Sequence, residues 1–255
     1  MKRARLRKIL IPLAVALFWL GLWELLSLLV GQELLLPSPL QVLRKLYQLA
    51  GTAAFWSQTA HSILRVLTGL VSAAVLGLLL AFASHRSKPV RALLSPIMTL
   101  VKSTPVASFI VLALVWLGRD VVPVIITGLM VLPVVWANVT EGLAGIDPQL
   151  LELAQVYGLP RARTRRRIVL PSVLPSFRAA LSSALGLGWK AGIAAEVLTV
   201  PRKSMGRMIF ESKQYLETTE LFAWTVTVIL LSLVIERLLL RMVSRIGRRR
   251  EASHA

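Results

Sequence analysis

Among the charged residues that stand inside otherwise apolar stretches of the chain, the first candidates for chemistry are Lys102, Lys190 and Glu196. If these stretches cross a bilayer, a charge at mid-depth costs about 2.5–3.5 kcal/mol on insertion scales, so each side chain is expected to face a bundle interior or water. Lysines beside such a path would favour an anionic solute, and Glu196, nearer the outer mouth, would pair with one of them. A Lys–Glu pair that only holds helices together explains the same residues, so both interpretations stay open.

Residue types for catalysis or metal binding are absent or badly spaced. The chain has no Cys, which excludes disulfides, thiolate metal sites and a cysteine nucleophile. Its three histidines, His61, His85 and His254, lie far apart and in no metal-ligand spacing such as H-E-x-x-H. No G-x-x-x-x-G-K-[ST] motif occurs, and "GLGWKA" at 186–191 has the wrong spacing. We therefore expect no catalytic residue, no metal, no cofactor and no P-loop ATP hydrolysis.

The apolar content of the chain points to a membrane protein. Hydrophobic residues make up 56% of the 255 residues and the mean hydropathy is +0.70, whereas ordinary soluble domains are ~45–50% apolar. A hydrocarbon core ~30 Å thick requires ~20 mainly apolar residues per helix. We therefore predict an all-α single domain, 1–255, with six transmembrane helices at about 9–30, 63–84, 92–117, 121–140, 178–198 and 221–243.

The distribution of basic residues predicts the topology. The four segments expected inside, 1–8, 84–91, 141–178 and 238–255, hold 19 of the 30 Lys and Arg residues, and the three outer segments hold 7. This asymmetry follows the positive-inside rule, so the net charge of +18 indicates two cytoplasmic termini rather than nucleic-acid binding. The basic start "MKRARLRK" is like that of a signal peptide, but the apolar run after it exceeds the 7–15 residues of an h-region, which favours a retained anchor.

The segment "LPSPLQVLRKLYQLA" predicts a short amphipathic helix after the first span. Ser38 is its candidate N-cap and Pro39 its first helical residue, followed by a polar face opposite a leucine-rich one. Such a helix lies in the outer membrane interface or packs on the bundle, and the sequence leaves both open.

A polar insertion, the cytoplasmic loop 141–176, separates the fourth and fifth spans. Asp147 is a candidate N-cap with Pro148 in the first turn, and Gly158 supplies a left-handed stop, so a helix of about ten residues is expected between them. A second short helix would start at Pro160 and carry five arginines at the inner headgroup level. Pro171 and Pro175 are then expected to break the backbone before the fifth span. The first helix carries an apolar ridge that requires a cover, which indicates a partner protein.

This loop resembles that of a known family. Six positions fit the pattern E-x-A-x3-G-x9-I-x-L-P found in the permease subunits of bacterial binding-protein-dependent ABC importers: Glu152, Ala154, Gly158, Ile168, Leu170 and Pro171. Leu153 departs from the family's usual alanine. The resemblance extends over nearly the whole chain to the nitrate, sulfonate and taurine branch, through "LLPSPLQVL" (35–43), 61–81, 103–118 and 206–225.

The resemblance implies a fold, an assembly and a set of contact residues. The fold would be that of a type I ABC importer permease in the prokaryotic inner membrane, surrounded by membrane lipid. The partners would be a second copy of this chain, two cytoplasmic ATPase subunits and an extracytoplasmic solute-binding protein, with no nucleic acid. Residues 148–158 would form the coupling helix, and the residues implied in ATPase coupling are Leu150, Leu151, Glu152, Leu153, Ala154, Gly158, Ile168, Leu170 and Pro171.

The expected function is therefore a transport subunit rather than an enzyme. It would form the path for a small anionic solute such as nitrate, a sulfonate or taurine, and an ATPase partner would hydrolyse ATP. Related members carry pyrimidine precursors of thiamine, which is one alternative. A self-sufficient, ion-coupled secondary transporter is another, although repeated halves with interrupted helices are not evident. An intramembrane enzyme would need a nucleophile with a base or metal ligands, and that constellation is missing.

Overall fold

A computed structural model describes residues 2–251, with side-chain surroundings for residues 10–11, 13–238 and 241. The regular structure of this range is helical throughout. The expected cytoplasmic ends, 1–8 and 238–255, extend beyond the described residues. The elements are α1 (Lys2–Val30), α2 (Pro39–Ala50), α3 (Ala53–Arg86), α4 (Lys88–Ser103), α5 (Val106–Trp116), α6 (Val122–Ala144), α7 (Pro148–Val156), α8 (Arg161–Thr164), the π-helix η1 (Arg165–Val169), α9 (Leu170–Thr199), α10 (Met205–Gln214) and α11 (Thr218–Glu251).

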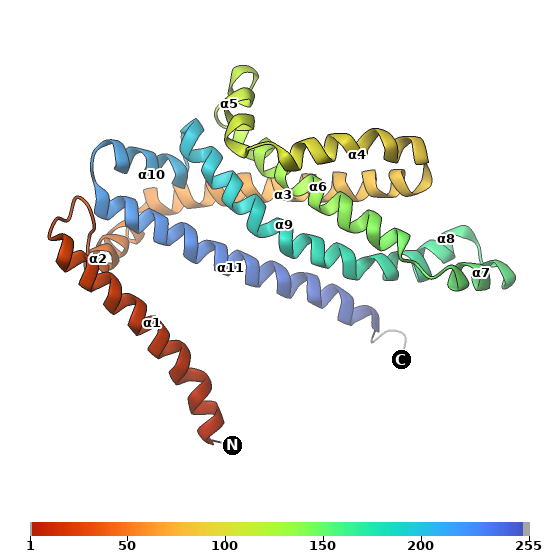
Figure 1. The fold of residues 1–255 in the computed structure, drawn as a ribbon, viewed down its shortest axis with the longest axis horizontal. Helices are drawn as coiled ribbons and strands as arrows, with labels where there is room; N and C mark the ends of the chain where they lie inside the picture. Colours follow the sequence, from red (N-terminus) through yellow and green to blue (C-terminus); the bar gives the residue numbers. More distant parts are fainter. Residues whose placement is uncertain (1, 252–255) are drawn as a thin grey trace.

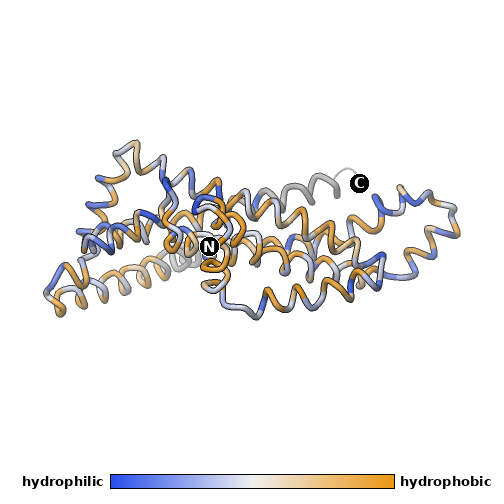
Figure 2. Tube along the Cα trace, turned by 90° about the horizontal axis from the view of Figure 1, so that it is seen from above, coloured by the Kyte–Doolittle hydropathy of each residue, from blue (hydrophilic) through white to orange (hydrophobic). Residues whose placement is uncertain are grey.

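The long helices form an elongated bundle with distinct ends. In Figure 1, α7, α8 and the corner between α3 and α4 lie at one end, and α2 and α10 lie at the other. Figure 2 shows hydrophilic residues gathered toward both ends, with mainly hydrophobic helices between them. The charge asymmetry of the sequence predicts that the α7–α8 end is the cytoplasmic one.

The core lies where α6 packs along both α3 and α9. Its largest cluster includes Leu70 of α3, Val131 and Val135 of α6, and Ala184 of α9, all of them buried. Gly192 of α9 lets the helix backbones approach closely, because a Cβ there would stand 2.5 Å from the Thr127 hydroxyl of α6. Small residues at helix contacts are the usual means of close packing between membrane helices.

Five described helices are long and apolar enough to cross a membrane, and a bent helix pair makes a sixth candidate. The predicted third span, 92–117, is that pair: α4 and α5 meet at an angle of 106°. The break has a local cause, since Pro105 disfavours helical geometry at the preceding residue and Thr104 is extended at φ −85° and ψ 134°. In Figure 1, α5 projects away from the bundle.

The predicted helix after the first span is α2, and it packs on the bundle. Ser38 caps it as predicted, and Gln41 completes a capping box with the backbone of Ser38. Its apolar residues, Leu46 and Leu49 among them, lie against a cluster that contains Trp224 of α11. Lys45 bonds Glu220 of α11 at 2.9 Å, and this carboxylate raises the pKa of Lys45 above its ordinary value.

The expected backbone break before the fifth span does not occur. Helical structure continues from α8 through η1 into α9, and Pro171 and Pro175 both lie within it. The reason is the wider turn just before Pro171, where the Leu170 amide donates to the Arg165 carbonyl five residues back. Such a π turn shifts the pattern of backbone hydrogen bonds at the point where Pro171 has no N–H group to donate.

Candidate functional site

The predicted cytoplasmic helix is α7, and local chemistry defines both its ends. Asp147 accepts a hydrogen bond from the Gln149 amide at 2.9 Å, and Pro148 occupies the first turn. The Tyr157 amide donates to Leu153, and Gly158 turns the chain at φ +61°, so that the Leu159 amide donates to Ala154 at 2.9 Å. This termination is the glycine stop expected from the sequence.

The residues of α7 form two faces, one packed against the bundle and one exposed. Ala154 is only 3% exposed, and Leu151 packs on the core cluster of this chain, so these two residues hold α7 on its own bundle. Glu152 and Gly158 are exposed. The apolar side chains that remain available to a partner, called the α7 tip below, are Leu150 (44% exposed), Leu153 (57%), Val156 (83%) and Tyr157 (75%).

The downstream members of the sequence pattern lie in η1 and at the start of α9. Ile168 packs on the core cluster, whereas Leu170 and Pro171 are exposed. The five arginines between Arg161 and Arg167 are also exposed, and none of them forms an ion pair with a described residue. The sequence pattern of this loop therefore combines residues that pack the loop on the bundle with residues that are exposed.

Lys102 and Lys190 lie on exposed surface, near the bent helix pair. Lys102 is in the last turn of α4, directly before the break. Lys190 is on α9 and precedes Ala191, which packs in a cluster with Val106 and Ile110 of α5. Within the described residues neither lysine takes part in an ion pair.

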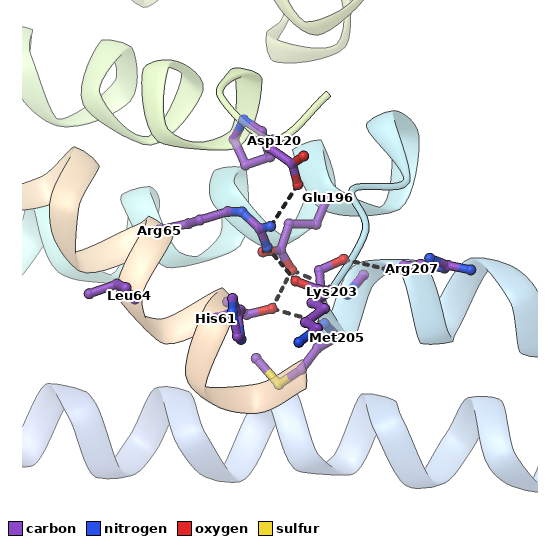
Figure 3. A network of polar contacts seen from close by, with 12 residues as sticks. His61, Leu64, Arg65, Asp120, Glu196, Lys203, Met205 and Arg207 are labelled. Atoms are coloured by element: carbon purple, nitrogen blue, oxygen red, sulfur yellow. Dashed lines mark hydrogen bonds and ion pairs between the residues drawn. The ribbon is translucent and has the colours of Figure 1, made fainter. Parts of the chain in front are cut away.

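Glu196, the third residue of the expected path, is fully buried, and its partners differ from those expected (Figure 3). The Ser62 hydroxyl donates to its carboxylate at 2.6 Å, Arg65 Nη1 lies 3.4 Å away, and the Gly206 amide donates at 3.3 Å. The expected pairing with Lys102 or Lys190 is therefore wrong. Among the described residues, no hydrogen bond or ion pair joins Glu196 to either lysine, and the carboxylate has no exposed surface for a solute.

Arg65 extends this contact into a network that joins four parts of the chain. Its Nη2 lies 2.8 Å from the Asp120 carboxylate in the turn before α6, and its Nη1 donates to the Lys203 carbonyl at 2.5 Å. The Ser62 hydroxyl also accepts from the Met205 amide at 2.8 Å. We call Ser62, Arg65, Asp120 and Glu196 the outer network, because it lies at the α2–α10 end of the bundle.

Sequence reasoning missed the outer network because its members lie far apart in the chain. Arg65 and Glu196 are separated by 131 residues, and Arg65 and Asp120 by 55. The only available signal was that Arg65, Asp120 and Glu196 are charged residues within or at the edge of apolar windows. The arrangement fixes helix positions and offers no free nucleophile, and no cluster of three metal-binding side chains occurs in the described part of the chain.

Comparisons with known proteins agree with the geometry. Residues 73–251 match the family described as binding-protein-dependent transport system inner membrane component. The chain is 28% identical to the taurine transport system permease protein TauC of Escherichia coli (strain K12), over 84% of this chain and 80% of that protein. It is 25% identical to the putative aliphatic sulfonates transport permease protein SsuC of Bacillus subtilis (strain 168), over 80% of this chain and 74% of that one.

A solved structure has the same fold. It is a bacterial alginate ABC transporter in complex with an alginate pentasaccharide-bound periplasmic protein, and one of its chains matches with a TM-score of 0.61. The match covers 97% of this chain and 96% of the other at 16% identity, so the likeness supports the fold alone.

Proposed function

The chain belongs to the family of inner membrane components of binding-protein-dependent transport systems, and on that basis we propose that it forms the path for a small anionic solute. It is a multi-pass inner membrane protein and the permease subunit of an ABC importer. The solute of this proposal is taurine, a zwitterion whose sulfonate group is anionic, or another sulfonate. The observation that carries it is the family match over residues 73–251, which spans the cytoplasmic loop and the helices around it.

Two features support an anionic solute. The relatives TauC and SsuC are named for taurine and aliphatic sulfonates, which carry a sulfonate group. Lys102 and Lys190 supply cationic groups on exposed surface beside the broken span, and neither is neutralised by a described acidic side chain. A charge within a span is expected to face a polar path rather than lipid. Glu196 belongs to the outer network and has no place in this path.

The proposed coupling element is α7 with its exposed tip. Four apolar side chains on a short cytoplasmic helix are a contact surface for a protein, because they would otherwise remain in water. The ATPase partner binds this tip, while Leu151 transmits the movement of α7 to the core cluster on which it packs. The proposed contact with the ATPase is therefore made by the exposed residues Leu153, Val156 and Tyr157 and not by the buried Ala154.

The proposed assembly has two copies of this chain, two ATPase subunits and an extracytoplasmic binding protein. In a single copy both lysines lie on the surface and not in an enclosed channel, so a closed path requires a second wall. The binding protein would dock at the α2–α10 end, which the charge asymmetry assigns to the outer face.

The test begins with purification of the tagged chain from its native membrane, followed by identification of the proteins that accompany it. The recovered complex is reconstituted in vesicles, and ATP-driven uptake of taurine is measured for wild type, Lys102→Met and Lys190→Met. Loss of a charged contact predicts a decrease in uptake of about tenfold or more. Lys213→Met, an exposed lysine on α10, is the matched control and is expected to retain uptake.

The outcomes separate the proposal from its alternatives. Unchanged taurine uptake by both path variants, with assembly intact, would remove the lysine path. Recovery of the chain without an ATPase, together with uptake that follows an ion gradient and not ATP, would favour the secondary transporter. Uptake of a thiamine-precursor pyrimidine in place of taurine would retain the importer and change its solute.

A further inference from the structure

An open apolar groove lies between α1, α2 and α11, near the α2–α10 end of the bundle. Its volume is about 620 Å³, within the ~300–1,000 Å³ range of small-molecule sites. Leu20, Gly21 and Glu24 line it from α1, Leu40 and Leu43 from α2, and Val226 from α11. Every lining residue except Glu24 is apolar or glycine. The proposed transport function leaves this groove without a role.

The walls of the groove are held in place although the groove itself is open. Trp23 Nε1 donates to the Pro37 carbonyl at 3.1 Å, and the Ser27 hydroxyl donates to the Leu36 carbonyl at 2.9 Å. These bonds fix the outer end of α1 against the segment before α2, and α1 then diverges from the bundle (Figure 1). Leu20 and Leu43 are 48% and 62% exposed, so apolar surface inside the groove is left uncovered.

Glu24 distinguishes this groove from ordinary lipid-facing surface. It is partly buried, it lies within the apolar window Leu13–Val30, and no hydrogen bond or ion pair joins it to a described residue. An unpaired carboxylate at such a position is costly, so a cationic partner is expected. Lys45 of α2 is not this partner, because its ammonium group pairs with Glu220 at 2.9 Å.

We infer that the groove binds a phospholipid with a primary amine headgroup, such as phosphatidylethanolamine. An acyl chain occupies the apolar walls, and the headgroup ammonium donates to the Glu24 carboxylate in a charge-assisted hydrogen bond. Glu24 precedes the end of α1 at Val30 by six residues, which is about 9 Å along the helix axis and within reach of the headgroup level. Arg44, which follows Leu43 and is exposed, supplies a cation for the lipid phosphate.

The chemistry discriminates between lipid classes. A phosphatidylglycerol headgroup carries the phosphate charge without an ammonium, so the Glu24 carboxylate repels it. A zwitterionic amine lipid satisfies Glu24 and Arg44 together. Given the proposed topology, this lipid belongs to the outer leaflet, whereas the exposed arginines of α8 and η1 lie at the opposite end of the bundle (Figure 1).

The experiment uses the full chain in nanodiscs that contain a trace of phosphatidylethanolamine or phosphatidylglycerol with a photoactivatable acyl chain. After illumination, labelled peptides are identified by mass spectrometry. The amine lipid is expected to label 17–26 and 39–46 about tenfold more than phosphatidylglycerol does, the ratio set by one charge-assisted hydrogen bond. Glu24→Gln is expected to abolish this preference, and Glu236→Gln, an exposed glutamate of α11 outside the groove, is expected to retain it.

A second variant tests the occupied volume. A Cβ at Gly21 would meet nothing within 4 Å, and Gly21 lines the groove, so Gly21→Leu is expected to fill part of it and to decrease labelling by both lipids. Equal labelling by the two lipids in wild type, or an unchanged preference in Glu24→Gln, overturns the inference. So does exclusion of lipid by cross-links to a second copy of the chain, because the occupant would then be protein. Uptake of solute is a separate readout, so failure here leaves the proposed function standing.

Discussion

Removal of the Arg65 side chain tests whether the outer network stabilises the fold through a buried ion pair. Glu196 is 0% exposed and the Arg65 side chain is 13% exposed, with 3.4 Å between Arg65 Nη1 and the carboxylate. In Arg65→Met the carboxylate stays buried and retains only the Ser62 hydroxyl and the Gly206 amide as donors. Breaking a buried pair in this way costs about 3–5 kcal/mol, because one charge remains uncompensated.

The network also predicts a ranking among its members. Asp120→Asn should cost about 1 kcal/mol or less, since the Asp120 side chain is 50% exposed and its pair with Arg65 is screened by solvent. Glu196→Gln should lie between, at about 1–3 kcal/mol, because the amide still accepts one hydrogen bond while Arg65 keeps Asp120 and the Lys203 carbonyl. The expected order of destabilisation is therefore Arg65→Met, then Glu196→Gln, then Asp120→Asn.

The assay is thermal unfolding of each purified variant in one detergent, combined with a double-mutant cycle. At about 2–4 °C per kcal/mol for a chain of this size, Arg65→Met should lower Tm by roughly 6–20 °C. The double variant Arg65→Met/Glu196→Gln should be more stable than the sum of the single changes by about 1 kcal/mol or more, since it no longer contains a buried lone charge. A coupling free energy near zero, or an Arg65→Met variant no less stable than Asp120→Asn, would refute the reasoning.

Three further sets of variants test the packing of α7, the helix contacts and the α2 ion pair. Leu153→Glu, on the α7 tip, should leave the free energy of unfolding within about 1 kcal/mol of wild type yet uncouple ATP hydrolysis from uptake. Ala154→Glu places a charge in a buried site and should lower Tm itself. Gly192→Ala should cost about 1–3 kcal/mol in a melting experiment, because its Cβ would meet an α6 hydroxyl at 2.5 Å, while Gly186→Ala, with nothing within 4 Å, should cost little. The Glu220 carboxylate raises the pKa of Lys45 in the folded protein. The contribution of this pair to the free energy of unfolding is therefore complete below the ordinary lysine pKa of about 10.4 and is lost as the pH rises through the higher folded value. The Tm of wild type should approach that of Lys45→Met only in that alkaline range.

Much of the helical framework could be predicted because its signals are local. Apolar windows as long as the bilayer is thick, the Ser38 cap and the Gly158 stop each depend on residues within one turn or one span. The bend at Pro105 also has a local cause, but its angle of 106° could not be predicted, because window hydropathy is insensitive to a change of direction. The break expected at Pro171 and Pro175 was wrong for a similar reason, since a π turn before Pro171 carries the helix onward.

The candidate sites could be predicted only in part. The α7 residues were correctly placed in one loop, but the division between Ala154, which is buried, and Val156, which is exposed, depends on how α7 rests on the core cluster. The same holds for the charges inside the spans. A charged residue in an apolar window signals that a partner must exist, whereas the identity of that partner depends on helix rotation and on which helices pack together.

The order of apolar and basic segments along the chain was therefore sufficient to predict a helical membrane protein and to suggest its orientation, because membrane insertion depends on summed hydropathy and flanking charge. Packing of α3 against α6 and α9 assigned Arg65, and neither lysine, to Glu196. The divergence of α1 from the bundle likewise created the groove that contains Glu24. Both arrangements join residues remote in sequence, and only the complementarity of packed helix surfaces in three dimensions brings such residues together.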